Sequence, residues 1–285
     1  MIPITDNHSH LDRKGKGIAA AKEFANAGGT HLILVSKPSW TIGVDVTEPD
    51  GFKPVFKETV GIAREINRSD IGVTVFTVLG VHPAEITRLT DQVGQKRAEE
   101  LMIRGLETAE RFVAENEAVG IKTGRPHYEV SDSIWDASNR IMAYGMELAR
   151  DVGCAVQLHT ETTDAAAITD LAAIAKKSGL APEKVVKHYA QPLVQVFERE
   201  GIFPSVLAGK GAIEAALAEG SRFMMETDYI DDPKRPGAVL GPKTVPRRTK
   251  QLIERSGEEA EVVEEVFWKV HKENPEQVYG IEITI

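Results

Sequence analysis

Two histidines lie one residue apart near the start of the chain, in the stretch "TDNHSHLD" at 5–12. The apolar residues "IPI" precede this stretch, which favours a strand, and residues i and i+2 of a strand point to the same face. His8 and His10 could therefore present both imidazole rings to one point, as a metal site requires. A polar turn after an edge strand is the alternative, and the rest of the chain must decide between them.

Further polar residues follow apolar runs at corresponding places. His82 follows the run in "LGVHPAE", and "EAVGIK", "CAVQLH", "KVVKH" and "SRFMMETD" end in Lys122, His159, His188 and Asp228. A single such histidine is more often a core residue than a ligand. Histidines at the ends of four predicted strands, together with an acid, indicate a site for one or two divalent metal ions. These ligands do not distinguish among zinc, manganese, magnesium, nickel and iron.

The elements that must position these residues alternate regularly between apolar, β-branched runs and helical patterns. Near-continuous apolarity is typical of parallel strands that are covered on both faces. The predicted strands are 2–8, 31–36, 72–80, 117–122, 154–159, 184–188, 201–207 and 221–228. Eight strand–helix units predict a (β/α)8 TIM barrel in which polar side chains meet at the C-terminal ends of the strands. A doubly wound sheet is the competing α/β fold, but no glycine-rich phosphate loop follows the first strand.

The length and composition favour one soluble domain, residues 1–285. The chain has 42% hydrophobic and 27% charged residues, and its formal net charge of −9 argues against broad coating of nucleic acid by the surface. No apolar run is long enough to cross a membrane, and no signal peptide is visible at Met1. The single cysteine, Cys154, excludes an intramolecular disulfide and lies in an apolar run typical of a buried thiol. A cytoplasmic location is expected, and the oligomeric state stays open.

Several residues near the predicted strand ends could contact substrate or orient ligands. Arg125 could clamp a phosphate, and His127 could either line the same loop or lie on the surface. Glu161 and Glu226, which neighbour predicted ligands, could orient them. A basic segment could add phosphate clamps or be a solvated loop; it contains Lys234, Arg235, Lys243, Arg247, Arg248 and Lys250. His31, at a strand start, and His271, in a C-terminal helical pattern, are placed outside the site.

The motifs "DNHSHLD", "GVHP", "QLHTE", "VKHYA" and "METD" resemble, in this order, those of the TatD family of metal-dependent hydrolases in the amidohydrolase superfamily. The stretch "ENPEQVYG" at 273–280 is similar to the closing motif of that family. The resemblance implies a barrel with a one- or two-metal centre that hydrolyses phosphoester bonds, often at DNA ends. It implies metal ligands at His8, His10, His159, His188 and Asp228, and a substrate-side role for His82.

One position departs from that family. TatD proteins usually place a metal-bridging glutamate on the fourth strand, where this chain has Lys122 in "VGIKTGRPHYE". Phosphotriesterases and lactonases, a second branch of the superfamily, use a carbamylated lysine, which is an anion. Carbamylation requires a neutral amine, and burial beside metals lowers the usual lysine pKa of about 10.4. The alternative is a free ammonium group directed at solvent or at a substrate phosphate.

Three functions remain open at this point. The motif set favours a phosphoesterase of TatD type, in which Asp228 takes a proton from a metal-activated water. Lys122 and the acidic surface favour an ester, lactone or amide hydrolase. A non-catalytic metal-binding scaffold is the third, and a ligand set that ends in an acid argues against it. The expected substrate is a small molecule or a nucleic-acid end, with no membrane partner.

Overall fold

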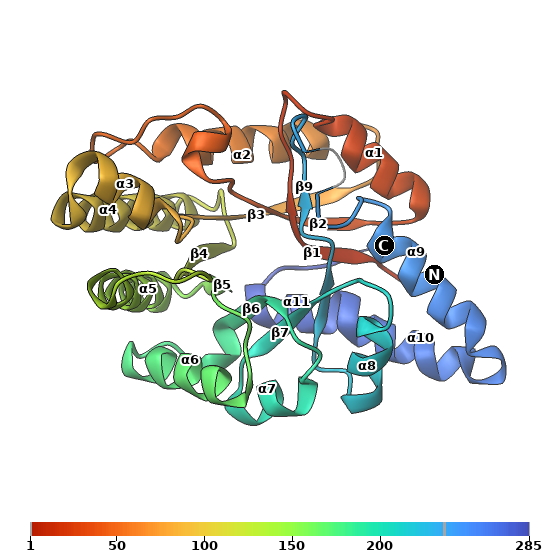
Figure 1. Cartoon of the computed structure of the whole chain (residues 1–285). Helices are drawn as coiled ribbons and strands as arrows, with labels where there is room; N and C mark the ends of the chain where they lie inside the picture. The colour runs from red at the N-terminus through yellow and green to blue at the C-terminus, as the bar shows by residue number, and fades with distance from the viewer. Residues whose placement is uncertain (1, 236–237, 285) are drawn as a thin grey trace.

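The computed structural model describes residues 2–235 and 238–284, and its centre is a parallel sheet in the order β8-β7-β6-β5-β4-β3-β2-β1-β9. Figure 1 shows the strands curving through the centre with the helices packed outside them. The strands are β1 (Thr5–His10), β2 (His31–Val35), β3 (Thr74–Gly80), β4 (Gly120–Gly124), β5 (Ala155–His159), β6 (Val185–Ala190), β7 (Phe203–Leu207), β8 (Met224–Glu226) and β9 (Tyr229–Ile230). The predicted α/β alternation with parallel strands is confirmed.

The first strand also meets the segment that joins the two edge strands of this order. Only Thr227 and Asp228 separate β8 from β9, and β9 pairs with β1. The amide of Thr227 donates to Asp6 Oδ1 at 2.9 Å, and the amide of Asp228 donates to the His8 carbonyl at 2.9 Å. These bonds bring the end of β8 beside the first strand.

Helices α1 to α8 lie between successive strands, α9 to α11 follow the last strand, and two features were not anticipated. The helices are α1 (Ile18–Ala27), α2 (Lys53–Asn67), α3 (Glu85–Val93), α4 (Gln95–Ala114), α5 (Asp132–Val152), α6 (Ala165–Lys177), α7 (Val194–Glu200), α8 (Ala212–Glu219), α9 (Thr244–Arg255), α10 (Ala260–Trp268) and α11 (Asn274–Tyr279). The sequence pattern did not indicate α3, a short additional helix before α4. A π-helical turn, Lys269–Glu273, joins α10 to α11, and the sequence pattern did not indicate it either. In the part of the chain that the structure describes, no helix is long and apolar enough to cross a membrane.

Four predicted strand ends, at His8, Lys122, His188 and Asp228, each lie two residues from the observed ends, and all four concern the site. Lys122 lies in the middle of β4, because the strand continues through Thr123 and Gly124. Asp228 lies outside β8, which ends at Glu226, and it adopts a left-handed conformation with φ 44°. The Thr227 hydroxyl binds Asp6 Oδ2 at 2.6 Å, which turns the chain before Asp228.

Apolar side chains fill both the interior of the sheet and the layer between sheet and helices. Inside, Ile33, Val78 and Val186 pack with Val278 and Tyr279, which α11 contributes at the end of the sheet where the strands begin. Cys154 is buried in the outer layer, and burial raises the pKa of its thiol to about 12. The predicted buried thiol is therefore confirmed.

The strands approach one another closely where the site residues lie. Gly80 pairs with Lys122, and a β-carbon at position 80 would collide with the Lys122 carbonyl oxygen. Gly124 pairs with His159 and has φ 152°, and a β-carbon there would collide with the His159 carbonyl oxygen. Glycine is required at both positions, because only a residue without a side chain permits this approach.

Candidate metal centre

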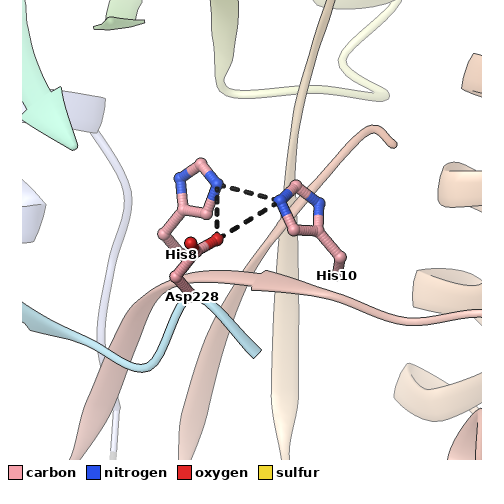
Figure 2. A group of neighbouring side chains, drawn as sticks. All are labelled: His8, His10 and Asp228. Carbon is pink, nitrogen blue, oxygen red and sulfur yellow. Dashed lines mark hydrogen bonds and ion pairs between the residues drawn. The ribbon is translucent and has the colours of Figure 1, made fainter. Parts of the chain in front are cut away.

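His8, His10 and Asp228 direct their polar atoms at one point (Figure 2). The two Nε2 atoms lie 3.1 Å apart, and Asp228 Oδ1 lies 3.8 Å from that of His8 and 3.6 Å from that of His10. The register between β1 and β2 shifts between Asp6 and Ser9, so an irregularity flanks His8. Such irregularities re-aim side chains. The early histidine pair is therefore part of a cluster that includes an acid, as predicted.

The hydrogen bond of His10 Nδ1 defines which ring nitrogen carries the proton. Nδ1 lies 2.8 Å from the Val35 carbonyl oxygen, which only accepts hydrogen bonds. Burial, and then the charge of Lys122, holds the pKa of His10 well below its usual range, so the ring is neutral. Nδ1 therefore carries the single proton, and the Nε2 lone pair faces the cluster.

For His8, a side chain, that of Gln157, holds the proton on Nδ1. Its Nδ1 lies 2.7 Å from Gln157 Oε1, and burial holds its pKa well below the usual range. Both Nε2 atoms of the pair thus carry lone pairs, and neither can donate to the other at 3.1 Å. Two nitrogen lone pairs and a carboxylate that converge without a proton between them fit a divalent cation such as Zn²⁺. These residues therefore fit the metal that the sequence motifs imply.

A second pair of buried histidines lies beside the first. His159 Nδ1 lies 3.2 Å from His188 Nε2. His188 Nδ1 lies 2.8 Å from Glu226 Oε1, and His159 Nε2 lies 2.9 Å from His127 Nδ1, so the outward ring nitrogens have partners. The register between β6 and β7 shifts between Lys187 and Ala190, again beside a site histidine. The predicted contact of Glu226 with a ligand histidine is present.

His8 and His188 connect the two pairs. Their rings stack with centroids 3.7 Å apart, and His8, His188 and Glu226 bring a second set of ligand atoms together. Burial raises the pKa of Glu226 to about 8 and that of Asp228 to about 6. The cluster is therefore one continuous polar region that is enclosed by protein.

Lys122 lies at this cluster with 1% of its surface exposed. Burial lowers the pKa of its amine to about 8, although Asp228 and Glu226 act in the opposite direction. Its charge in turn depresses the pKa of His10 and of His159, which belong to different pairs. A buried amine with a lowered pKa is partly neutral near pH 8, which carbamylation requires.

A cavity of about 1070 Å³ opens over the cluster. The site residues that line it are His10, His82, Lys122, His127, His159, His188 and Asp228. Trp40, Ile42, Tyr189 and Ile230 add apolar surface around it. Tyr189 has φ 53°, a costly conformation for an aromatic residue, and its amide donates to Glu226 Oε1 at 2.9 Å.

Arg125 does not reach this cavity, unlike the other predicted substrate residues. Its guanidinium group binds Glu161 Oε2 at 2.9 Å and Asp170 Oδ2 at 2.7 Å, and it lies over the Trp135 ring. These partners occupy the donors that a phosphate would need. The geometry therefore assigns Arg125 to fixing Glu161, which lines the cavity. Glu161 binds Arg125 in place of the predicted contact with a ligand histidine.

The basic segment separates into two parts. Lys234 and Arg235 line the cavity mouth. Lys243 lies 3.3 Å from Glu23, Lys250 donates to the Ala27 carbonyl at 2.7 Å, and Arg248 lies 3.8 Å from Glu214. These last three side chains hold α9 against its neighbours α1 and α8. Only the first part is placed to meet a substrate.

The sequence interpretation did not identify Gln157 or the residues that hold it. A signal was available, since Gln157 is a polar residue inside the apolar run "CAVQLH". It lies two residues before His159 and therefore points to the same side of β5. The contact of Tyr279 with Gln157 joins residues 122 positions apart, and no local pattern indicates it.

Known proteins resemble this chain in sequence and in fold. The chain is 42% identical over 288 residues to an uncharacterised protein of Methanocaldococcus jannaschii, MJ1127, with 100% of this chain and 98% of that protein covered. The structure resembles the TatD homologue YJJV of Escherichia coli, with TM-score 0.66 and 18% identity over 98% of each chain. It also resembles a variant of an organophosphorus hydrolase from Deinococcus radiodurans, with TM-score 0.58, 15% identity and coverage of 98% of this chain and 94% of that one. These two likenesses describe the fold.

The family follows from the sequence match. Residues 5–280 match the model of the family described as TatD related DNase. The matched range begins with β1, includes both histidine pairs and Asp228, and extends to the end of α11. The chain therefore belongs to the family of TatD-related hydrolases.

Proposed function

We propose that this protein is a metal-dependent hydrolase that uses a metal-activated water to cleave phosphoester bonds. The observation that carries the proposal is the pair of Nε2 lone pairs of His8 and His10, 3.1 Å apart and within 4 Å of Asp228 Oδ1. Two Nε2 lone pairs and a carboxylate in this arrangement match the ligand set of a divalent cation such as Zn²⁺. His8, His10 and Asp228 would hold one ion, and His159 and His188 a second.

We further infer that the sheet is a closed eight-stranded barrel of one domain. The hydrogen bonds from Thr227 and Asp228 to β1 support this closure. The lone pairs lie toward the ends of β1, β5 and β6, where barrels of this class carry their chemistry. A cytoplasmic location is consistent with the reduced, buried Cys154.

Lys122 would serve as the bridging group in carbamylated form. A positive ammonium group beside two cations is unfavourable, and carbamylation converts the amine into an anion with two oxygen ligands. Burial of Lys122 and the lowered pKa of its amine, to about 8, support this chemistry. The position between two histidine pairs matches a bridge, since the charge of Lys122 acts on both pairs.

The residues of the chain divide the remaining tasks. When bound, divalent ions acidify water and polarise the phosphoryl oxygen. Asp228 would accept the proton of the attacking water and pass it to the leaving group. Its carboxylate lies at the cluster and borders the cavity, which supports this role. His82 lies on the substrate side; its Nδ1 accepts from the Ala84 amide at 3.1 Å, so its Nε2–H is free to donate.

A second candidate function is hydrolysis of carboxylic esters or lactones. Lys122 favours it, because the phosphotriesterase and lactonase branch places a lysine at this position. The phosphoester proposal rests on the family match and on Lys14, Lys234 and Arg235 at the cavity. A non-catalytic scaffold is disfavoured, because such a protein would need neither the acid at position 228 nor a large open cavity.

Chelation and a substrate panel test the proposal. Protein treated with chelator should lose turnover of p-nitrophenyl phosphates or single-stranded DNA, and added Zn²⁺ or Mn²⁺ should restore it. Full activity in demonstrably metal-free protein would overturn the proposal. Lactone turnover with no phosphoester turnover would favour the second candidate.

A salt series separates a nucleic-acid substrate from a small one. DNA binding should weaken steeply with salt, because each phosphate contact releases counterions. The double variant Lys234→Ala/Arg235→Ala should reduce that slope. Arg247→Ala/Arg248→Ala, on α9 and outside the cavity lining, is the matched control and should leave it unchanged.

A further inference from the structure

The closing stretch "ENPEQVYG" lies at the opposite end of the strands from the cavity, yet its Tyr279 contacts Gln157, the partner of His8. Asn274 Nδ2 donates to the carbonyl oxygens of Ser221 and Phe223, both at 2.8 Å, and so fixes the segment before β8. Gly280 ends α11 in a left-handed conformation with φ 66°. These contacts hold Tyr279 inside the sheet among apolar residues.

The Tyr279 hydroxyl belongs to a directional chain of hydrogen bonds. It accepts from Gln157 Nε2 at 2.6 Å and donates to Asn7 Oδ1 at 3.0 Å. Asn7 Nδ2 then donates to Ser205 Oγ at 3.0 Å. Each of these four residues is buried, so the hydrogen bonds are shielded from water.

This chain determines how the Gln157 amide is turned. Its Nε2 donates to the Asn7 carbonyl at 3.0 Å as well as to Tyr279, so both of its N–H groups have acceptors. A flipped amide would place two oxygens against each other at Asn7. Gln157 Oε1 must therefore face His8 Nδ1, 2.7 Å away, and hold the proton on that nitrogen.

We propose that Gln157 and Tyr279 are positioning residues that select the tautomer of His8 and leave its Nε2 free for a metal ion. Gln157 contacts His8 directly, and Tyr279 acts through Gln157. The inference rests on the proposed function in so far as it concerns metal binding. The tautomer itself is a property of the metal-free protein, so the two claims can fail separately.

The first measurement is the protonation state of the His8 ring. Long-range ¹⁵N–¹H correlation spectra of the ¹⁵N-labelled, metal-free full-length protein report which ring nitrogen carries the proton. We expect Nδ1–H in the wild type and a mixture of tautomers in Gln157→Leu. Nε2–H in the wild type, or Nδ1–H retained in full in Gln157→Leu, would overturn the proposal.

The second measurement is Zn²⁺ affinity by competition with a chromophoric chelator. Loss of the partner of a ligand histidine typically weakens metal affinity about 10–100-fold. We expect this loss in Gln157→Leu and a smaller loss in Tyr279→Phe, which removes only the hydroxyl. Tyr144→Phe removes a hydroxyl that binds Glu107 on the outer helices and should leave the affinity unchanged.

The two measurements separate the inference from the proposed function. If the wild type binds no Zn²⁺ while the His8 tautomer responds to Gln157→Leu, the proposed function fails and the positioning role stands. If Gln157→Leu does not fold, Tyr279→Phe decides alone. An unchanged tautomer together with unchanged affinity in that variant would overturn the role of Tyr279, because a purely structural tyrosine would move neither.

Discussion

Buried histidines occur at both ends of the strands, but the two ends treat them differently. At the cavity end, His8 and His10 direct lone pairs at each other, and His159 Nδ1 lies 3.2 Å from His188 Nε2. At the other end, His271 Nδ1 accepts from the Thr5 amide at 3.2 Å, and its Nε2 lies 2.8 Å from the Thr249 hydroxyl. Both ring nitrogens of His271 have complementary partners, whereas His8 and His10 each have one ring nitrogen without such a partner.

The histidines at the two ends of the strands do not differ in charge or in burial. Burial lowers the pKa of His271 to about 3, and it holds those of His8 and His10 well below their usual range. All three rings are therefore neutral at pH 7. A lowered pKa alone therefore does not distinguish a structural histidine from a candidate metal ligand. The hydrogen-bond partner of the second ring nitrogen does.

Removal of the cavity pair should have the largest effect. The double variant His8→Ala/His10→Ala should lose bound metal and reduce turnover to the background rate, since the ligand atoms of one site are gone. The fold should persist, because the main-chain pairing of β1 with β2 and β9 does not depend on these rings. Elemental analysis, kinetics and circular dichroism measure the three properties. Retained metal with retained turnover would show that the cavity end is not the metal centre.

Two substitutions of Lys122 distinguish a bridging carbamate from a free ammonium group. If a carbamate bridges the ions, Lys122→Ala should lose metal and activity, with partial rescue by added short carboxylic acids. Lys122→Glu restores a bridging anion and should keep measurable activity. If the lysine is instead a free ammonium group that binds phosphate, Lys122→Ala should keep its metals and mainly raise KM, and Lys122→Glu should be the worse enzyme. Metal content and kinetics of the two variants distinguish these cases.

His271→Ala should affect stability and leave metal content unchanged. Loss of a buried ring with two hydrogen-bonded nitrogens is expected to cost about 2–4 kcal/mol at pH 7. Denaturant unfolding of chelated protein measures this cost without a contribution from metal binding. Loss of bound metal in this variant would contradict the division between the two ends.

The same variant makes a pH prediction. The folded state depresses the pKa of His271 to about 3, so the unfolded chain binds a proton that the folded protein does not as the pH falls below the ordinary histidine range. The stability that neutral His271 contributes is complete above that range and is lost as the pH falls toward 3. The difference in unfolding free energy between wild type and His271→Ala should therefore be smaller at pH 5 than at pH 7. A constant difference would show that the ring titrates equally in both states.

The sequence by itself determined which residues could carry the chemistry and on which kind of element. The apolar runs predicted parallel strands, and the ends of those runs indicated His8, His10, His82, His159 and His188. The exclusion of His31 and His271 from the cavity also agrees with the structure, in which His271 packs against Thr5 at the start of β1. These inferences depend on local spacing, which a strand converts directly into direction.

Only the tertiary structure determined which side chains contact one another at the site. Asp228 reaches His8 and His10 from outside β8, because hydrogen bonds to Asp6 turn the chain at Thr227. The guanidinium group of Arg125 binds Glu161 and Asp170 and therefore does not line the cavity.

Gln157 and Tyr279 show most clearly which contacts the sequence could not predict. Gln157 faces His8 across 149 positions of sequence and contacts Tyr279 across 122. Spacing along one strand gives the direction of a side chain but not its neighbour, which depends on the register between strands and on the segments packed inside them. That neighbour decides whether both ring nitrogens of a buried histidine are hydrogen-bonded or whether one keeps a lone pair that could bind a metal ion.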